Sequence, residues 1–445
     1  MSTIAPETTP PAPGSPLPPT AVSTRELRRV SLASLLATTI EWYDFYVYAT
    51  LAAIVFPHVF FTDVSPAVGA VLSFATMAAG FVSRPLGALV FGRIGDQVGR
   101  KAMLVTALIT IGVVSLGIGL VPGYASIGAA GAVILTVLRF LQGLAVGGQW
   151  GGAVLLIAEK APAKRRGFYA GIAQQGVPGG LIASGLAVAI LTNVLNKDDF
   201  AAWGWRLPFF LGAVLTALAL VLILRVEETV AAKGVMGAVV KRPSVLSVFR
   251  SHPRALIVGF AAQLGLTTGA YIQGTWTANY ATSLIDEPIA RADILWPGIA
   301  GSVVSVGGIF FFSWLSDRIG RRIIMLSGFV FAILWIYPLL LMYSTGSLPL
   351  IWLASLVYAI PHSMMFGPLA ALLTELFTKD VRATGISISY QLGGTLGGGI
   401  ASVVAAALFL ATGAIGSVAI YVAAALVLGF AGTLLARDRR AVSLD

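Results

Sequence analysis

Twelve apolar stretches, separated by short polar segments, follow one another along the chain of 445 residues. A helix needs about 20 residues to cross the hydrocarbon core of a bilayer, so most of these stretches are long enough to span it. Those longer than about 26 residues are expected to tilt or to extend beyond the lipid. The pattern predicts an all-α membrane protein with twelve transmembrane helices. The expected spans are 30–56, 67–92, 102–121, 127–157, 167–194, 206–224, 255–283, 293–316, 323–343, 349–374, 383–411 and 414–436.

A short basic signature occurs twice, each time between a second and a third apolar stretch. The first copy, GRIGDQVGRK, covers residues 92–101, and the second, SWLSDRIGRR, covers 313–322, an offset of 221 residues. Glu159 and Glu375, each at the end of a fourth stretch, repeat at a similar offset of 216 residues. The repeats predict two pseudo-symmetric six-helix halves, an architecture that holds its binding site between the halves near the membrane centre.

Composition divides the chain into two halves and three connecting or terminal segments. Residues 30–224 and 255–436 are expected to form the N-terminal and C-terminal six-helix halves. Residues 1–29 are rich in proline and predict a disordered cytoplasmic tail. Residues 225–254 are expected to be a basic cytoplasmic linker, and 437–445 a short cytoplasmic tail.

Charge is scarce and unevenly placed. Hydrophobic residues make up 57% of the chain and charged residues 11%, whereas soluble domains carry about 25% charged residues. The net charge of +10 indicates topology rather than a nucleic-acid partner, because 24 of the 29 lysines and arginines lie in the tails and loops of one side and three lie on the other. Basic loops stay in the cytoplasm, so both termini are expected there.

Several kinds of chemistry are not indicated. The chain has no cysteine, so disulfides are excluded. Glycine runs at 176–180 and 393–399 lie within apolar stretches and no Lys-Ser/Thr follows them, so they do not indicate a nucleotide site. They predict close helix contact, either as sliding surfaces between moving parts or as tight packing without motion. No metal-ligand cluster, cofactor motif or convergent nucleophile is evident, and the chain is not expected to be an enzyme.

The two basic signatures are candidate gates. Gly95 and Gly99 permit a tight backbone, and Asp96 is placed to accept hydrogen bonds from a helix N-terminus of the other half. The alternative is a basic turn that only sets topology, but topology alone does not require an Asp at fixed spacing. The predicted gating residues are Asp96, Arg100, Lys101, Glu159, Asp317, Arg321, Arg322 and Glu375.

Four charged residues fall inside predicted spans, where charges are rare and usually functional. Glu41 and Asp44 are three residues apart and share a helix face. They are the candidate proton-coupling residues: we expect Asp44 to neutralise Arg139 and Glu41 to be the principal proton carrier. Arg84, or Arg139 once released, would bind a substrate carboxylate through paired hydrogen bonds. The alternative is that all four form structural ion pairs.

The C-terminal half offers polar rather than charged groups. Pro361 and Pro368 are expected to interrupt the tenth span and to free carbonyl groups toward a cavity. His362, beside this break, is a candidate for binding substrate or a proton, although a buried histidine is as often a packing residue. The predicted substrate-binding residues of both halves are Arg84, Arg139, Gln142, Gln149, Gln273, His362, Tyr390 and Gln391.

The motifs together carry a family resemblance. The two basic signatures resemble the loop signature of the major facilitator superfamily, and RFLQG at 139–143 resembles its motif in the fourth span. The resemblance extends over the chain after residue 30 and is closest to the shikimate-permease-like branch of the metabolite:proton symporters. The further segments that carry it are 41–45, 84–87, 203–209, 168–169, 390–391 and 417–421.

The resemblance implies a secondary active transporter of the bacterial inner membrane, a monomer that works by alternating access. It would import a small carboxylate-bearing metabolite, such as shikimate or a di- or tricarboxylate, together with protons. One position departs from the family, whose members commonly have Glu where this chain has Gln149, and glutamine carries no proton at physiological pH. Proton coupling through that position is therefore in doubt.

Other functions are weighed against this one. A proline or betaine symporter is disfavoured because relatives that sense osmolarity have long coiled-coil tails, whereas only about nine residues follow the last span here. A drug exporter remains an alternative because one fold hosts many functions. A membrane sensor without transport activity would need a soluble domain, and the sequence indicates none.

Overall fold

The computed structural model describes residues 23–225, 245–283, 285 and 289–437. This part of the chain is almost entirely helical and contains no strand. The predicted tails at 1–22 and 438–445, and residues 226–244 of the predicted linker, lie outside it. The helices of the N-terminal half are α1 (Thr24–Ile54), α2 (Phe56–Phe60), α3 (Pro66–Gln97), α4 (Arg100–Leu120), α5 (Tyr124–Ile127), α6 (Ala130–Ala158), η1 (Ala163–Arg165), α7 (Arg166–Gln174), α8 (Gly176–Val194), α9 (Lys197–Ala202), η2 (Gly204–Arg206) and α10 (Leu207–Leu224).

The C-terminal half has the same plan, with two irregular spans. The seventh span of the chain consists of α13, the π-helical segment η3 and α14. The eleventh consists of α18, the π-helical segment η5 and α19. The bounds are α12 (Val245–Ser251), α13 (Pro253–Tyr271), η3 (Ile272–Trp276), α14 (Thr277–Ser283), α15 (Arg291–Ile319), α16 (Arg321–Ser344), α17 (Leu348–Leu376), η4 (Lys379–Val381), α18 (Arg382–Gly394), η5 (Thr395–Gly399), α19 (Ala401–Thr412) and α20 (Ile415–Leu434).

Eleven helices of the described part are long and apolar enough to cross a membrane. The first predicted span corresponds to α1, which is not among the eleven although its 31 residues are sufficient in length. It carries Glu41 and Asp44 together with many hydroxyl-bearing side chains, which make it more polar than the others. All twelve predicted spans are helical, so the predicted all-α membrane fold is confirmed.

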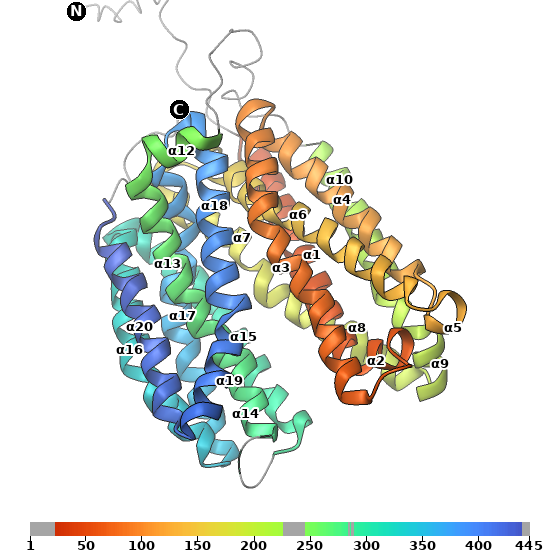
Figure 1. The fold of residues 1–445 in the computed structure, drawn as a ribbon. Helices are drawn as coiled ribbons and strands as arrows, with labels where there is room; N and C mark the ends of the chain where they lie inside the picture. The colour runs from red at the N-terminus through yellow and green to blue at the C-terminus, as the bar shows by residue number, and fades with distance from the viewer. Residues whose placement is uncertain (1–22, 226–244, 284, 286–288, 438–445) are drawn as a thin grey trace, which may run out of the picture.

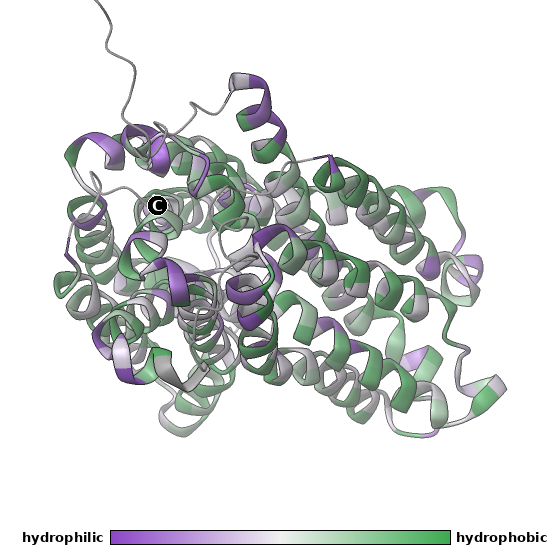
Figure 2. Ribbon diagram, turned by 90° about the horizontal axis from the view of Figure 1, so that it is seen from above, coloured by the Kyte–Doolittle hydropathy of each residue, from purple (hydrophilic) through white to green (hydrophobic). Residues whose placement is uncertain are grey.

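The helices form two groups, α1–α10 and α12–α20. In Figure 1 the groups lie against each other at the end near α12 and diverge toward the end that carries α2 and α14. Both groups are hydrophobic over most of their helices, as Figure 2 shows, which suits a lipid surrounding. The groups meet where α3 packs against α18 and where α7 packs against α15 and α17. We call the end at which they meet the hairpin face, since it carries the signatures at 92–101 and 313–322.

Two features differ from the predicted segments. Helix α1 begins at Thr24, six residues before the expected start, because Ser23 caps it by accepting a hydrogen bond from the Glu26 N–H at 3.1 Å. Residues 24–29 are therefore helix rather than part of the tail. In the predicted linker, the described residues include the short helix α12.

The prediction that Pro361 and Pro368 interrupt the tenth span is wrong. Helix α17 continues through both prolines from Leu348 to Leu376. A proline removes one backbone donor, but an open break would leave further backbone groups without partners in an apolar surrounding, and the unbroken helix avoids this. The irregular backbone lies instead in η3 of the seventh span and in η5 of the eleventh.

Most glycines of the two runs pack within one half, although an added Cβ on Gly399 of η5 would lie 3.4 Å from the Phe81 ring of α3 in the other half. A Cβ atom on Gly176 would lie 2.2 Å from the Thr38 hydroxyl of α1, and one on Gly397 would lie 2.3 Å from the Thr267 hydroxyl of α13. The fifth span thus packs closely on the first, and the eleventh on the seventh. These contacts support the tight-packing interpretation over sliding surfaces between the halves.

Gly180→Val is expected to destabilise the N-terminal half. Its Cβ would lie 2.5 Å from the Trp42 Cβ and 2.6 Å from the backbone nitrogen of Tyr43, and overpacking of this kind costs about 1–3 kcal/mol. The thermal unfolding midpoint in detergent should fall by several degrees. Gly185→Ala on the same helix is the control, because nothing lies within 4 Å of its added Cβ. Equal midpoints for the two variants would contradict the packing described.

Candidate functional site

A small cavity lies near the middle of α1, α3 and α6. Five of the predicted site residues line it: Glu41 and Asp44 from α1, Arg84 from α3, and Arg139 and Gln142 from α6. The structure therefore brings together the four charged residues that the sequence places inside spans. The other lining residues are Phe45, Met77, Gly80, Phe81, Gly143 and Val146.

Asp44 and Arg139 form a buried, neutral cluster. The Arg139 guanidinium lies 3.5 Å from the Asp44 carboxylate. Gln142 joins them, because its amide NH2 donates to Asp44 and its carbonyl accepts from Arg139, and the Ser115 hydroxyl also donates to Asp44. The guanidinium further stacks over the Tyr48 ring at 4.0 Å. This arrangement is the predicted neutralisation of Arg139 by Asp44, strengthened by neutral donors.

Glu41 differs from its neighbour because its carboxylate is buried without a partner. Its side chain is 4% exposed, and its Oε2 atom makes no hydrogen bond within the described part of the chain. A buried carboxylate without a hydrogen-bond donor is unfavourable in its charged form, because burying a charge in an apolar surrounding carries a large desolvation penalty. The position suits a group that alternates between neutral and charged forms.

Arg84 is held by aromatic rings instead of by an acid. Its guanidinium lies 4.5 Å from the centre of the Phe81 ring and 5.5 Å from that of Phe45. Among the described residues it forms neither an ion pair nor a hydrogen bond, and its side chain is half-buried. Its donors are therefore available to a ligand, and cation–π contact keeps the charge in place meanwhile.

The remaining predicted substrate-binding residues do not line this cavity. Gln149 donates to the Ala37 carbonyl and holds α6 against α1. Gln391 donates to the Val146 carbonyl at 3.1 Å and so connects the two halves. Gln273 is half-buried in η3, and the ring of His362 stacks on Phe366 at 5.4 Å.

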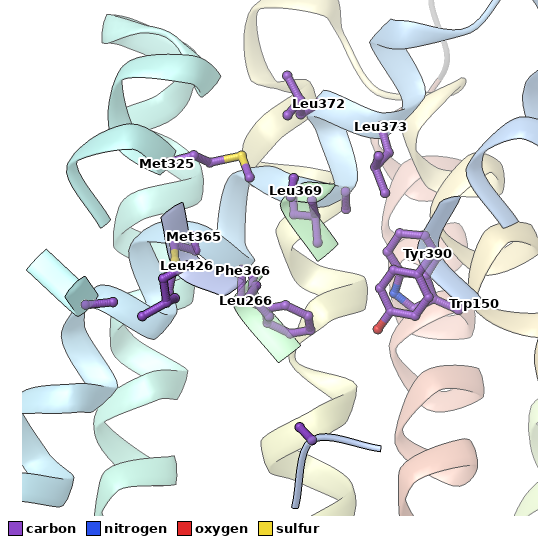
Figure 3. Close-up of a cluster of buried hydrophobic side chains, with 14 of the residues drawn as sticks. Trp150, Leu266, Met325, Met365, Phe366, Leu369, Leu372, Leu373, Tyr390 and Leu426 are labelled. Atoms are coloured by element: carbon purple, nitrogen blue, oxygen red, sulfur yellow. The ribbon is translucent and has the colours of Figure 1, made fainter. Parts of the chain in front are cut away.

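Tyr390 closes the space between the halves on the side of the hairpin face. Its ring lies flat on that of Trp150, with the centroids 3.6 Å apart and the planes at 9°. Figure 3 shows this stacked pair beside the apolar side chains Leu266, Phe366 and Leu369 of the C-terminal half. Trp150 belongs to α6 and Tyr390 to α18, so the stack joins opposite halves.

The first signature forms a polar network between the halves at the hairpin face. Asp96 accepts hydrogen bonds from the backbone N–H groups of Ala383 and Thr384, both at 2.9 Å, at the start of α18. Arg100 contacts Asp96 at 3.0 Å and Glu159 at 3.3 Å. Arg382 of the other half contacts Glu159 at 3.2 Å. The Asp thus caps a helix N-terminus, which its charge favours.

The second signature repeats this network with the halves exchanged. Asp317 accepts from the N–H groups of Gly167 and Phe168 at 2.8 and 2.9 Å, at the start of α7. Arg321 contacts Asp317 at 2.7 Å and Glu375 at 3.2 Å. Arg166 of the N-terminal half lies 3.5 Å from Glu375. We call these two sets, with Arg100–Glu159–Arg382 and Arg321–Glu375–Arg166 at their centres, the paired networks.

Three glycines and one basic residue of the signatures have separate roles. Gly99 and Gly320 have φ angles of 135° and 111°, which glycine adopts without strain, and they make the turns between helices. Gly95 lies within α3, where a Cβ would approach Ala383 to 2.8 Å. Lys101 donates to the Leu224 carbonyl at 2.8 Å, outside the paired networks.

The sequence did not single out every residue of importance. Arg166 follows Glu159 at the same spacing at which Arg382 follows Glu375. This shared spacing was the signal in the sequence that could have identified both arginines. Ser115, Tyr48 and Phe81, which surround the charged groups, are ordinary members of apolar spans and carry no signal in one sequence.

The structure has two pseudo-symmetric helix groups, a charged cavity lined by α1, α3 and α6 of the N-terminal group, and mirrored polar networks that join the groups at one face. These features define a membrane transporter of the two-half type. The comparison with known families agrees. Residues 35–402 match the model of the Major Facilitator Superfamily, and the chain belongs to this family. It is accordingly a multi-pass membrane transporter and not an enzyme.

Two curated relatives are transport proteins of Escherichia coli strain K12. The chain is 38% identical to the inner membrane metabolite transport protein YhjE, over 94% of this chain and 95% of that one. It is 35% identical to a shikimate transporter, over 94% of this chain and 96% of that one. The predicted resemblance to metabolite transporters is confirmed.

Solved structures share the fold at low sequence identity. The proton:xylose symporter XylE aligns with a TM-score of 0.75 at 16% identity, over 92% of this chain and 95% of that one. FucP, solved in the outward conformation, aligns with a TM-score of 0.67 at 15% identity, over 91% of this chain and 99% of that one. At this identity the likeness concerns the fold alone.

Proposed function

We propose that the protein imports a small carboxylate-bearing metabolite together with protons across a bacterial inner membrane, with both termini in the cytoplasm. The metabolite and shikimate transporters among its relatives support the substrate class. The concentration of lysine and arginine in the loops of the hairpin face supports the orientation. Alternating access of the two halves would carry substrate and proton to the other side.

One observation carries the proposal: the cavity holds an acid and a base that make no direct ion pair with each other, beside a cluster that is already neutral. Within the described part of the chain, no donor is hydrogen-bonded to the Glu41 Oε2 atom and no carboxylate lies within ion-pair distance of Arg84, whereas Asp44 and Arg139 contact each other. We assign the proton to Glu41 and the substrate carboxylate to Arg84. Asp44, the second candidate proton-coupling residue, serves in this scheme to neutralise Arg139.

The paired networks supply the conformational part of the proposal. They join the halves at the hairpin face, and the Trp150–Tyr390 stack closes the path between that face and the cavity. The helix groups diverge at the opposite end (Figure 1). This arrangement corresponds to a state that receives substrate from the outside, and release would require the networks to separate.

The proline/betaine alternative meets a specific difficulty at the same site. A quaternary ammonium group is usually bound on aromatic faces, but the faces of Phe45 and Phe81 are already taken by the Arg84 guanidinium. A cationic ligand group would have to displace an arginine. A carboxylate meets no such competition.

Arg84→Gln is expected to weaken substrate affinity. Hydrogen bonds to charged groups contribute about 1.5–3 kcal/mol, so KM for the transported acid should rise roughly tenfold or more, at 1.4 kcal/mol per factor of ten. Uptake of labelled shikimate into proteoliposomes, with the outside more acidic, measures it. Arg93→Gln is the control, because Arg93 lies on the same helix but is exposed at the hairpin face.

The same assay tests the proposed function as a whole. The unmodified protein should accumulate a carboxylate against its gradient only while the pH gradient lasts, and an internal pH dye should report proton entry. Transport of panel acids without proton movement would refute the symport, and an unchanged KM in Arg84→Gln would refute the assignment of the carboxylate.

A further inference from the structure

We infer that the site carries one monocarboxylate with one proton, so that each transport cycle moves no net charge and dicarboxylates are excluded. The inference rests on the proposed function and narrows it to a charge class. It follows from the number of charged groups that the cavity offers, taken with the energy of burying a charge that has no partner.

The charges of the cavity balance in pairs. Asp44 and Arg139 neutralise each other at 3.5 Å, and the two remaining charged groups that line the cavity are Glu41 and Arg84. With Glu41 ionised the set is neutral. Once Glu41 has taken a proton, Arg84 leaves a net charge of plus one, and a substrate with a single carboxylate restores neutrality. The monoanion can therefore be buried without net charge only when Glu41 is protonated, and Glu41 can take its proton without net charge only when the monoanion is bound.

A second carboxylate finds no cation. Tyr271 of α13 lies near Phe81 of the cavity wall, with the ring centroids 6.4 Å apart, and Tyr390 of α18 stacks on Trp150. Both are neutral phenols that supply no positive charge. The lysines and arginines of α13, α15 and α18 lie at the helix ends, and α17 has none between Leu348 and Leu376. His362 of α17 stacks on Phe366 and does not line the cavity. A dianion would therefore bury an uncompensated negative charge, which is strongly unfavourable.

Arg139 does not serve as the missing partner. Its guanidinium is 5% exposed, contacts Asp44 and Gln142, and stacks on Tyr48. Transfer of Arg139 to a substrate would strip Asp44 of its cation and leave a buried carboxylate behind. The walls around Arg84 are the rings of Phe45 and Phe81, so the body of the acid meets apolar surface and needs no further charge.

The test uses the full chain in proteoliposomes at neutral pH. The probes are labelled shikimate and succinamate, each with one carboxylate, and succinate and citrate, which carry more. Succinamate and succinate form a matched pair, because a neutral amide replaces one carboxylate in a chain of the same length. Under an inward proton gradient, we expect at least one monocarboxylate to accumulate tenfold or more above succinate and citrate.

A second measurement separates the charge balance from substrate preference. A membrane potential is imposed by a potassium gradient with valinomycin, at equal pH on both sides. Electroneutral symport predicts no accumulation under this potential, and full accumulation when the pH gradient is applied with the potential clamped at zero. Accumulation driven by the potential alone would overturn the one-to-one balance.

The outcomes distinguish this inference from the function on which it rests. Proton-coupled accumulation of succinate or citrate would overturn the inference and leave the symport standing. If none of the four acids moves with protons, the proposed function fails and the inference fails with it. Accumulation of monocarboxylates that ignores the potential supports both.

Discussion

Glu41→Gln should abolish uphill uptake driven by a pH gradient while exchange of labelled for unlabelled substrate continues. Glutamine has nearly the same shape as protonated glutamate but cannot release a proton. The variant is therefore fixed in the form that binds a monoanion, and the loaded carrier can still change its orientation. Without deprotonation at the inner side, net accumulation loses its driving force. We expect accumulation to fall to the level reached without a gradient.

Counterflow at equal pH is the measurement that separates coupling from damage. A variant that fails to fold or to bind loses counterflow as well as accumulation, whereas a coupling variant loses accumulation only. Glu26→Gln makes the same chemical change on the same helix, away from the cavity. It removes the ion pair between Glu26 and Lys160 at 2.6 Å, so it also controls for the loss of an ion pair, and it should keep both activities. Persistent pH-driven accumulation in Glu41→Gln would show that the proton travels through another group.

The sequence was sufficient for the architecture and for the charged centre. Apolar periodicity gave twelve spans, and the offset between the signatures gave two halves. Charges inside apolar stretches are so unfavourable that each one marks a position of interest, and Glu41, Asp44, Arg84 and Arg139 indeed surround one cavity. These inferences depend on local composition, which can be obtained from a single sequence.

Ion pairs between residues that are distant in the sequence were harder to predict. That Arg166 reaches Glu375 and Arg382 reaches Glu159 depends on how two halves dock, and no local pattern encodes that docking. Polar groups such as Gln149 and Gln391 looked like ligands for a substrate, yet each donates to a backbone carbonyl of a neighbouring helix. In an apolar surrounding, a polar side chain serves packing as readily as binding, and only its position decides between them.

The prediction of where the helices become irregular was also wrong. Prolines suggested a break in α17, which is continuous, whereas the π-helical segments η3 and η5 carry no proline. An inserted residue in a helix is set by packing against neighbours, and such segments are frequent at functional positions. Both segments contain glycine, but glycine alone does not distinguish a π-helical segment from a regular close-packed helix.

Arg382→Ala should open the hairpin face. The variant leaves Glu159 with Arg100 alone and removes the ion pair that crosses between the halves. Hydrogen bonds between charged groups contribute about 1.5–3 kcal/mol, so the open population should rise roughly tenfold or more. Arg166→Ala should act similarly through Glu375, because the paired networks are equivalent. The two changes together should add if the networks are independent.

Cysteine labelling measures this opening without background, because the chain contains no cysteine. Ser387→Cys is a suitable reporter: Ser387 is 1% exposed, it faces Gly151 of the other half, and its hydroxyl makes no hydrogen bond to any residue that the structure describes. A membrane-impermeant maleimide supplied at the hairpin face should label the reporter about ten times faster in the Arg382→Ala background. Arg165→Ala, which removes an exposed arginine near the same face, should leave the rate unchanged. Equal rates in all three backgrounds would mean that the networks do not hold the halves together, and closure would then depend on the Trp150–Tyr390 stack and its apolar surroundings.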